Sequence, residues 1–155
     1  MHAYHDTGVV LKLYFQESFS EATNDYVARQ GLAIPVCLFQ ETEIENAMQL
    51  KLFRKEITVA QHARAMQDLV DDVAIGRLVR RPVNWIEAFS EARKLSAAVT
   101  AKNGCRTLDV LHVAIGKLWG CSEFVTMDDR QIAAARAAGL KVVDVRRLRP
   151  AAGRG

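Results

Sequence analysis

The sequence predicts one α/β domain with a mainly parallel sheet, from its segment pattern, its length and its composition. The candidate strands are short apolar segments, at residues 3–5, 32–37, 123–126 and 141–145. Long stretches rich in Ala, Leu, Glu, Lys and Gln separate them, as expected for helices. Parallel neighbours need a crossover, usually a helix, so this alternation favours a mainly parallel sheet with helices on its faces. The chain has 155 residues, and 50% of them are hydrophobic, which is enough for one ordinary core.

The stretches between the candidate strands predict helices, at residues 7–15, 19–30, 39–54, 58–74, 84–102, 107–119 and 129–138. No Gly/Ser-rich linker, repeat or low-complexity tract divides the sequence. We therefore expect a single domain over residues 1–145. Residues 146–155 are rich in arginine and end in Ala-Ala-Gly-Arg-Gly, which predicts a basic, flexible C-terminal tail.

The composition excludes several classes of protein. No apolar run reaches the roughly 18 residues that cross a bilayer, and the N-terminus lacks the features of a signal peptide. We therefore expect a cytoplasmic protein that does not enter a membrane. The cysteines are odd in number and form no C-x-x-C pair, so we expect small core residues at Cys37, Cys105 and Cys121. The formal charge of +3 suits an anionic partner without requiring one.

Two aspartates directly follow candidate strands. In a parallel α/β sheet, ligands collect outside the carboxyl ends of the strands. Asp6 ends the first candidate strand, and Thr7 after it is a plausible helix N-cap. Asp128 follows the apolar segment that ends at Thr126. We expect both carboxylates to emerge at this edge of the sheet.

Two further acids lie on predicted helices. Asp109 falls in the first turn of the 107–119 helix and continues its apolar side, so it is expected to point inward. An inward aspartate needs a partner. Glu43 shares a side of its helix with Ala47 and Leu50, although acidic neighbours flank it as on an ordinary solvated face.

Each acid also has a plain structural explanation, because carboxylates near helix N-termini interact favourably with the helix dipole. A shared location is harder to explain in this way, because like charges brought together raise one another's pKa and destabilise the fold. Converging carboxylates normally imply a cation, and hard oxygen ligands select Mg²⁺ or Mn²⁺ over zinc. The candidate catalytic residues and metal ligands are therefore Asp6, Glu43, Asp109 and Asp128.

Short segments that contain these acids follow the order and spacing of a known family: D-T-G-V-V at 6–10, E-x-x-N-A at 43–47, R-T-L-D-V-L-H at 106–112 and F-V-T-M-D at 124–128. They resemble the PIN domain and, more narrowly, the VapC-type ribonuclease toxins. The similarity runs from Tyr4 to about Val145. It implies a three-layer α/β/α sandwich with a central parallel sheet, dependence on Mg²⁺ or Mn²⁺, and endonucleolytic cleavage of RNA. It also implies a homodimer and a cognate antitoxin.

Matched by position, the acidic residues of the family fall on Asp6, Glu43, Asp109 and Asp128. Glu43 depends mainly on this family pattern, whereas strand-end or helix-face geometry also supports the three aspartates. Thr126 and Asp129 lie near enough to contribute, and they rank below Asp128.

Other motifs carry less weight. His112, one turn after Asp109, is interpreted as a hydrogen-bonded structural histidine, with a role as ligand or general base as the alternative. Basic residues suit phosphate contacts, and scattered surface charge explains them about as well, at Lys51, Arg54, Lys55, Arg80, Arg81, Lys102 and Arg106. The sequence contains no G-x-S-x-G elbow, Cys-His arrangement or glycine-rich nucleotide loop, which disfavours acyl transfer and nucleotide-cofactor chemistry.

The expected reaction is hydrolysis of RNA phosphodiester bonds by a metal-activated water, which needs no protein nucleophile. Three alternatives stay open. The same site would suit a DNA nuclease or a structure-specific processing nuclease. A PIN-like scaffold could bind RNA or protein without cutting, and a small-molecule phosphohydrolase would need a pocket too narrow for a polymer.

Overall fold

The computed structural model describes residues 3–149, whose contacts divide them into two units. The first unit is discontinuous, because it joins the residues up to Asp6 with residues 82–148. The second unit comprises residues 7–81, together with Arg149. Each unit has its own parallel strands and its own helices.

A three-stranded parallel sheet runs through the first unit. Its strands, in the order β1-β4-β5, are β1 (Ala3–His5), β4 (Glu123–Thr126) and β5 (Lys141–Asp144). Tyr4 stands opposite Phe124, and both side chains are fully buried. Because the pairings are parallel, the carboxyl ends of these strands meet at the same edge of the sheet.

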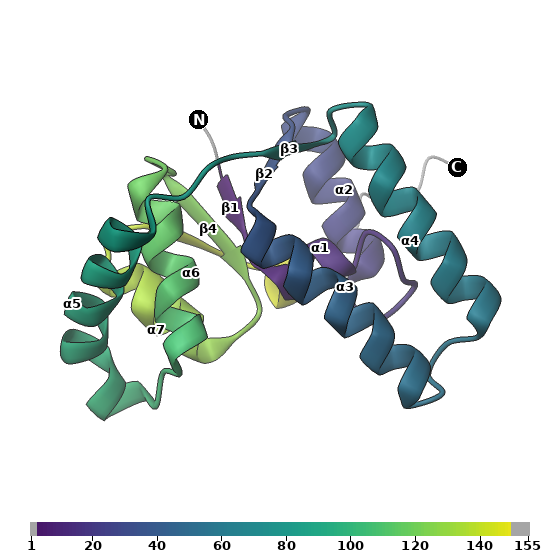
Figure 1. The fold of residues 1–155 in the computed structure, drawn as a ribbon. Coiled ribbons are helices and arrows are strands. Elements are labelled where there is room, and N and C mark those ends of the chain that lie inside the picture. Colours follow the sequence, from purple (N-terminus) through teal and green to yellow (C-terminus); the bar gives the residue numbers. More distant parts are fainter. Residues whose placement is uncertain (1–2, 150–155) are drawn as a thin grey trace. The chain divides into compact units, whose positions relative to one another are not determined.

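Three helices of the first unit pack against one another, α5 (Trp85–Asn103), α6 (Thr107–Leu118) and α7 (Asp129–Ala137) (Figure 1). Helix α7 also contacts β4 and β5, and the 3₁₀ helix η1 (Val145–Arg147) follows β5. Helix α6 is buried from Asp109 to Gly116. A Cβ atom at Gly116 would lie 3.1 Å from Cβ and Cγ of Tyr4, so the glycine permits the close approach of α6 to β1.

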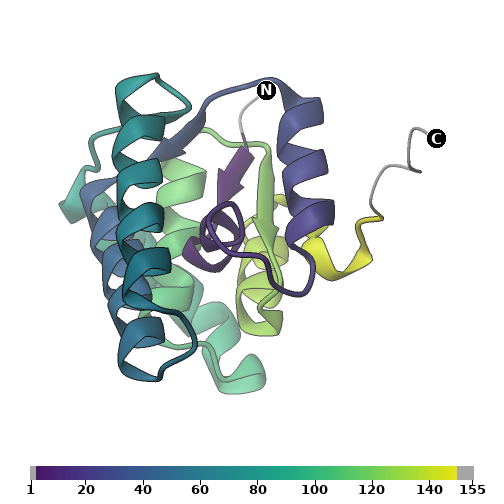
Figure 2. The same ribbon diagram turned by 90° about the vertical axis from the view of Figure 1, so that its right-hand side faces the viewer.

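The second unit contains the parallel pair β2 (Ile34–Val36) and β3 (Leu78–Arg80). Its helices are α1 (Thr7–Leu11), α2 (Ser20–Gln30), α3 (Leu38–Phe53) and α4 (Val59–Ala74). Helices α3 and α4 pack side by side (Figure 2). Helix α4 begins at a capping box, in which the side chains of Thr58 and Gln61 each accept a hydrogen bond from the other residue's backbone N–H.

The predicted α/β class with parallel strands and flanking helices is confirmed. Two elements differ from the predictions. Strand β3 was not predicted, because it has three residues, of which Val79 and Arg80 are exposed, and it forms by pairing with β2 far away in sequence. The helix predicted over 7–15 ends at Leu11, after which backbone bonds of the i to i−3 type turn the chain.

Within residues 3–149, no helix has both the length and the apolar character needed to cross a bilayer. The thiols are free and buried, as expected for core residues, at Cys37, Cys105 and Cys121. The single domain predicted over residues 1–145 stays a prediction. Of the predicted tail, Arg146 and Arg147 belong to η1, and residues 150–155 lie outside the described residues.

Candidate active site

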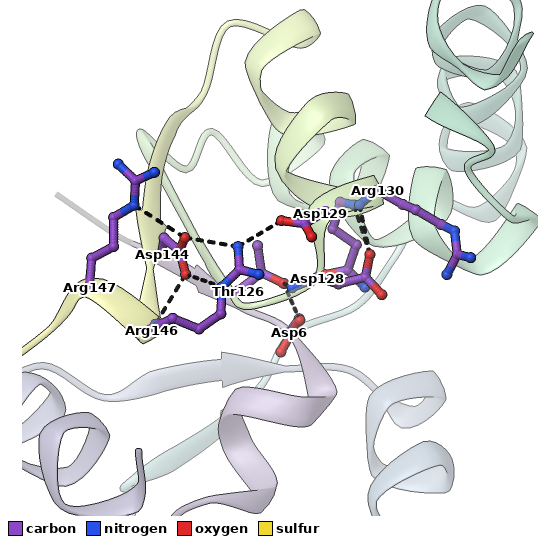
Figure 3. Close-up of polar contacts among 9 residues, drawn as sticks. Asp6, Thr126, Asp128, Asp129, Arg130, Asp144, Arg146 and Arg147 are labelled. Atoms are coloured by element: carbon purple, nitrogen blue, oxygen red, sulfur yellow. Dashed lines mark hydrogen bonds and ion pairs between the residues drawn. The ribbon is translucent and has the colours of Figure 1, made fainter. Parts of the chain in front are cut away.

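Asp6 lies where β1 ends, at the carboxyl edge of the three-stranded sheet. Its backbone N–H donates to the carbonyl oxygen of Val125 at 3.0 Å, which continues the β1–β4 pairing by one residue. Its side chain is buried, and one carboxylate oxygen accepts a hydrogen bond from the hydroxyl of Thr126 (Figure 3). Thr126 is the last residue of β4 and is fully buried. The strand end therefore presents Asp6 in a fixed position.

Thr126 also holds the segment that carries Asp128. The backbone N–H of Asp128 donates to Oγ1 of Thr126 at 3.1 Å, and the side-chain amide of Gln131 lies 2.8 Å from the same oxygen. Oδ1 of Asp128 accepts from the backbone N–H groups of Arg130 and Gln131, at 2.8 and 3.4 Å, and so caps α7. One hydroxyl therefore joins Asp6 to the turn that bears Asp128 (Figure 3).

Asp109 occupies the first turn of α6 and points inward, with 4% of its side chain exposed. Its Oδ2 accepts the backbone N–H of Arg106 at 2.8 Å, which satisfies one of the free donors at the start of the helix. Asp109 and Asp128 thus both cap the N-terminus of a helix, which is the structural role that the sequence offered as an alternative to metal binding. Each uses one carboxylate oxygen for it.

The other oxygens of the two capping aspartates face a single cation. Nη2 of Arg106 lies 3.5 Å from Oδ1 of Asp109 and 3.6 Å from Oδ2 of Asp128. Hydrogen bonding to Asp109 raises the pKa of Arg106 further above its usual value. His5, which precedes Asp6, is neutral at pH 7 because burial lowers its pKa to about 4. Arg106 is therefore the cation that the two carboxylates share.

The donor chemistry fits a hard divalent cation, although the side chains as they stand do not form a metal cage. Among residues 3–149, no group of three or more His, Cys, Asp or Glu side chains is placed to hold a metal ion. The contacts explain this, because Asp109 and Asp128 each give one oxygen to a helix cap, and Nη2 of Arg106 faces the other oxygen of each. Nε of Arg106 also lies 3.3 Å from the capping oxygen of Asp109. Withdrawal of Arg106 would leave two converging carboxylate oxygens, which is the ligand type that Mg²⁺ and Mn²⁺ prefer.

Glu43, the remaining predicted acid, lies on α3 in the second unit. Its half-buried carboxylate accepts a hydrogen bond from the hydroxyl of Thr7 at 2.5 Å, and Thr7 follows Asp6 directly in the sequence. Its neighbour Glu41 is buried and binds the guanidinium of Arg80 through both oxygens, each at 2.8 Å. The structure thus describes a defined polar contact for Glu43, and its place in a metal site stays a prediction.

Comparison with solved structures gives the fold a known counterpart. The chain resembles the crystal structure of FitAcB from Neisseria gonorrhoeae with a TM-score of 0.64, over 94% of this chain and 99% of that chain. The fold is PIN-like. The sequence identity is 14%, so the likeness concerns the fold alone. No protein-family model matches the sequence, and no curated protein matches it either.

Three side chains of the candidate site had no leading role in the sequence predictions. Arg106 was considered only for phosphate contact, Thr126 ranked below Asp128, and Gln131 was not considered. All three lie within three residues of Asp109 or Asp128. A search for the residues that precede and open each helix would have found them, since helix termini gather capping partners around an acid.

His112 is hydrogen-bonded, as expected, and its described partner is a tyrosine hydroxyl where a neighbouring carboxylate was expected. It is buried, and its Nδ1 lies 2.8 Å from the hydroxyl of Tyr4. The ring of Tyr4 stacks on that of Phe124, with 5.1 Å between the centroids. These contacts tie α6 to β1 and β4 and support the interpretation of His112 as a packing residue.

Proposed function

We propose that this protein is a metal-dependent endoribonuclease and the toxin of a VapBC-type toxin–antitoxin pair. One observation carries the proposal: two aspartates from different helices direct an oxygen at the same positive charge, and a buried threonine links a third aspartate to one of them. The PIN-like fold and the resemblance of the acidic segments to VapC-type toxins support the same function.

The chemistry of the proposal assigns separate tasks to the acids. Asp109 and Asp128 would hold Mg²⁺ or Mn²⁺ through the oxygens that now face Arg106, and Asp6 would be the third ligand of this unit. Glu43 is the fourth proposed acid, on the family pattern. When bound, the ion supplies charge that polarises the phosphate and lowers the pKa of a water molecule. Thr126 orients Asp6, because its hydroxyl donates a hydrogen bond to the buried carboxylate.

Digestion of labelled RNA and DNA, with Mg²⁺ and with EDTA, tests the reaction. We expect RNA to be cut internally in Mg²⁺ and left intact in EDTA. Asp109→Asn and Asp6→Asn should lower the cleavage rate by more than the ~10–100-fold that loss of an outer-shell partner costs at a metal site. Asp129→Asn is the matched control, because Asp129 is next to Asp128 and its side chain is 81% exposed. Cleavage that persists in EDTA would refute the metal dependence, and preferential cutting of DNA would favour the DNA-nuclease alternative.

A non-catalytic scaffold is the second candidate function. The observation that favours it is the role of Asp109 and Asp128 as helix caps, which accounts for both acids without a metal. A scaffold would bind RNA or protein equally well with Asp6→Asn or Asp109→Asn, and expression of either variant would affect cell growth as the wild type does. Loss of toxicity in both variants, with binding retained, would exclude it.

The proposed partners follow from the same resemblance. We expect RNA as substrate, a cognate antitoxin, a homodimer and a cytoplasmic location. Co-expression with a small protein encoded by the neighbouring reading frame should relieve growth arrest, and light scattering should give twice the mass of the chain. Growth arrest that such a protein does not relieve would contradict the toxin–antitoxin part and leave the nuclease part in place.

A further inference from the structure

Arg106 occupies an unusual place among the acids of the candidate site. Its Nη2 atom lies between the two outward oxygens, at 3.5 Å from Asp109 Oδ1 and 3.6 Å from Asp128 Oδ2. The Nε atom adds a contact of 3.3 Å to Oδ2 of Asp109. Nη2 therefore faces the two oxygens that the proposed function gives to a divalent cation, and Nε contacts the capping oxygen of Asp109.

The oxygens of the two aspartates are divided between two kinds of partner. Backbone N–H groups at the starts of α6 and α7 hold Oδ2 of Asp109 and Oδ1 of Asp128, at 2.8 Å each. The donors of these bonds are backbone groups, so the bonds persist without the arginine side chain, whose Nε is a second and more distant donor to Oδ2 of Asp109. The capped carboxylates would therefore keep their positions if the guanidinium moved, and their two outward oxygens would still converge.

Arg106 is also able to leave. Its side chain is 67% exposed, whereas those of Asp109 and Asp128 are 4% and 29% exposed, so rotation toward solvent would cost the arginine little packing. A guanidinium is not deprotonated in proteins, so it can vacate the acids only by moving. Contacts of 3.3 to 3.6 Å with a largely exposed side chain belong to the weak class of ion pairs.

We propose that Arg106 is a resident counter-ion of the acidic site, which offsets the charges of Asp109 and Asp128 in the metal-free protein and competes with the divalent cation for their outward oxygens. This inference rests on the proposed metal site. Arg106 would then act through the two aspartates and set the concentration of divalent cation at which the site is half occupied. The metal-free fold gains stability from it, and cation binding has to displace it.

Titration with Mn²⁺ in the absence of RNA, followed by the electron paramagnetic resonance of free Mn²⁺, tests the competition. Arg106→Met keeps an apolar stem and the capping backbone N–H but removes the charge. We expect this variant to bind Mn²⁺ roughly two- to tenfold more tightly than the wild type, as the loss of weak competing ion pairs predicts. Arg106→Lys should remain close to the wild type because it keeps a positive charge.

Arg93→Met is the matched control for net charge, because Arg93 is exposed on α5 of the same unit. It should leave the affinity for Mn²⁺ unchanged. In EDTA, Arg106→Met should melt at a lower temperature than the wild type, and saturating Mn²⁺ should raise its Tm by more. Both shifts are independent of nuclease activity.

The outcomes separate this inference from the proposed function. Equal or weaker Mn²⁺ binding by Arg106→Met, in a protein that binds Mn²⁺, would overturn the counter-ion role and leave the metal site standing. An equal gain in Arg93→Met would reduce the effect to net charge and overturn the role as well. Absence of Mn²⁺ binding in the wild type and in Arg106→Met would overturn both proposals together.

Discussion

Among single residues, Thr126 links two acids of the candidate site through one hydroxyl. Its hydroxyl donates to the buried carboxylate of Asp6 and accepts the backbone N–H of Asp128. Thr126→Val keeps the shape of the side chain and removes both bonds and the contact with Gln131, so it leaves a buried carboxylate with one donor fewer. We expect the free energy of unfolding in urea to fall by about 1–3 kcal/mol and the cleavage rate to fall with it.

Thr126→Ser is the control for this change, because it keeps the hydroxyl and loses one methyl group. Its unfolding free energy should fall by no more than about 1 kcal/mol, and its cleavage rate should stay near that of the wild type. If Thr126→Val were as stable and as active as Thr126→Ser, the hydroxyl would have no role in holding Asp6.

The positions of the acids could be predicted from the sequence, whereas their hydrogen-bond and ion-pair partners could not. Asp6 and Asp128 follow strands, and Asp109 continues an apolar helix side, so local patterns contain their positions. The bond from Thr126 to Asp6 spans 120 residues of sequence, and no local pattern contains it. Arg106 was missed for another reason, since an exposed arginine near a helix start is ordinary until both of its partners are known.

At the scale of elements, the contact between α6 and β1 depends on Gly116. A Cβ atom there would meet Cβ and Cγ of Tyr4 at 3.1 Å. Tyr4 has little room to move, because it is fully buried, stacked on Phe124 and hydrogen-bonded to His112. Gly116→Ala should gain about 1 kcal/mol in helix propensity. We expect a larger loss from overpacking, of about 1–3 kcal/mol, and hence a lower Tm in calorimetry.

Lys117→Ala is the comparison for Gly116→Ala, since Lys117 lies on the exposed side of the same helix and pairs with Glu91. Its effect should stay within about 1 kcal/mol, as for other exposed ion pairs. Gly116→Val should be worse than Gly116→Ala, because its larger side chain meets the same ring. A Tm that rises in Gly116→Ala would show that β1 can shift away from α6.

The elements themselves were largely predictable, because apolar segments and helix-forming stretches alternate clearly along the chain. Strand β3 is the exception with a clear physical cause. Strand β3 exists through its pairing with β2, and its own residues are mostly exposed. A strand of this kind is specified by its partner, so only tertiary structure reveals it.

The first unit is discontinuous in sequence, and this affects how the whole chain folds. Strand β1 pairs with β4, so residues 7–81 form a long insertion that the first unit must close in order to fold. Closing a flexible loop of this length costs conformational entropy. A folded insertion lowers this cost, because it already holds its own two ends in place. We therefore expect the two units to be coupled in folding through chain connectivity. The sequence could not predict this division, because no linker or change of composition marks Asp6 or Pro82.

Unfolding in urea, followed with two probes, tests this coupling and the predicted single domain. The two tryptophans, Trp85 and Trp119, lie in the first unit, so their fluorescence reports on it, whereas far-ultraviolet circular dichroism reports on both units. Leu69→Ala removes a buried side chain from α4 of the second unit and should cost about 2–5 kcal/mol there. With coupling, both probes shift to lower urea together, and the neighbouring exposed control Val70→Ala moves neither. A tryptophan transition that stays in place while the dichroism transition moves would instead make residues 7–81 an independently folding domain.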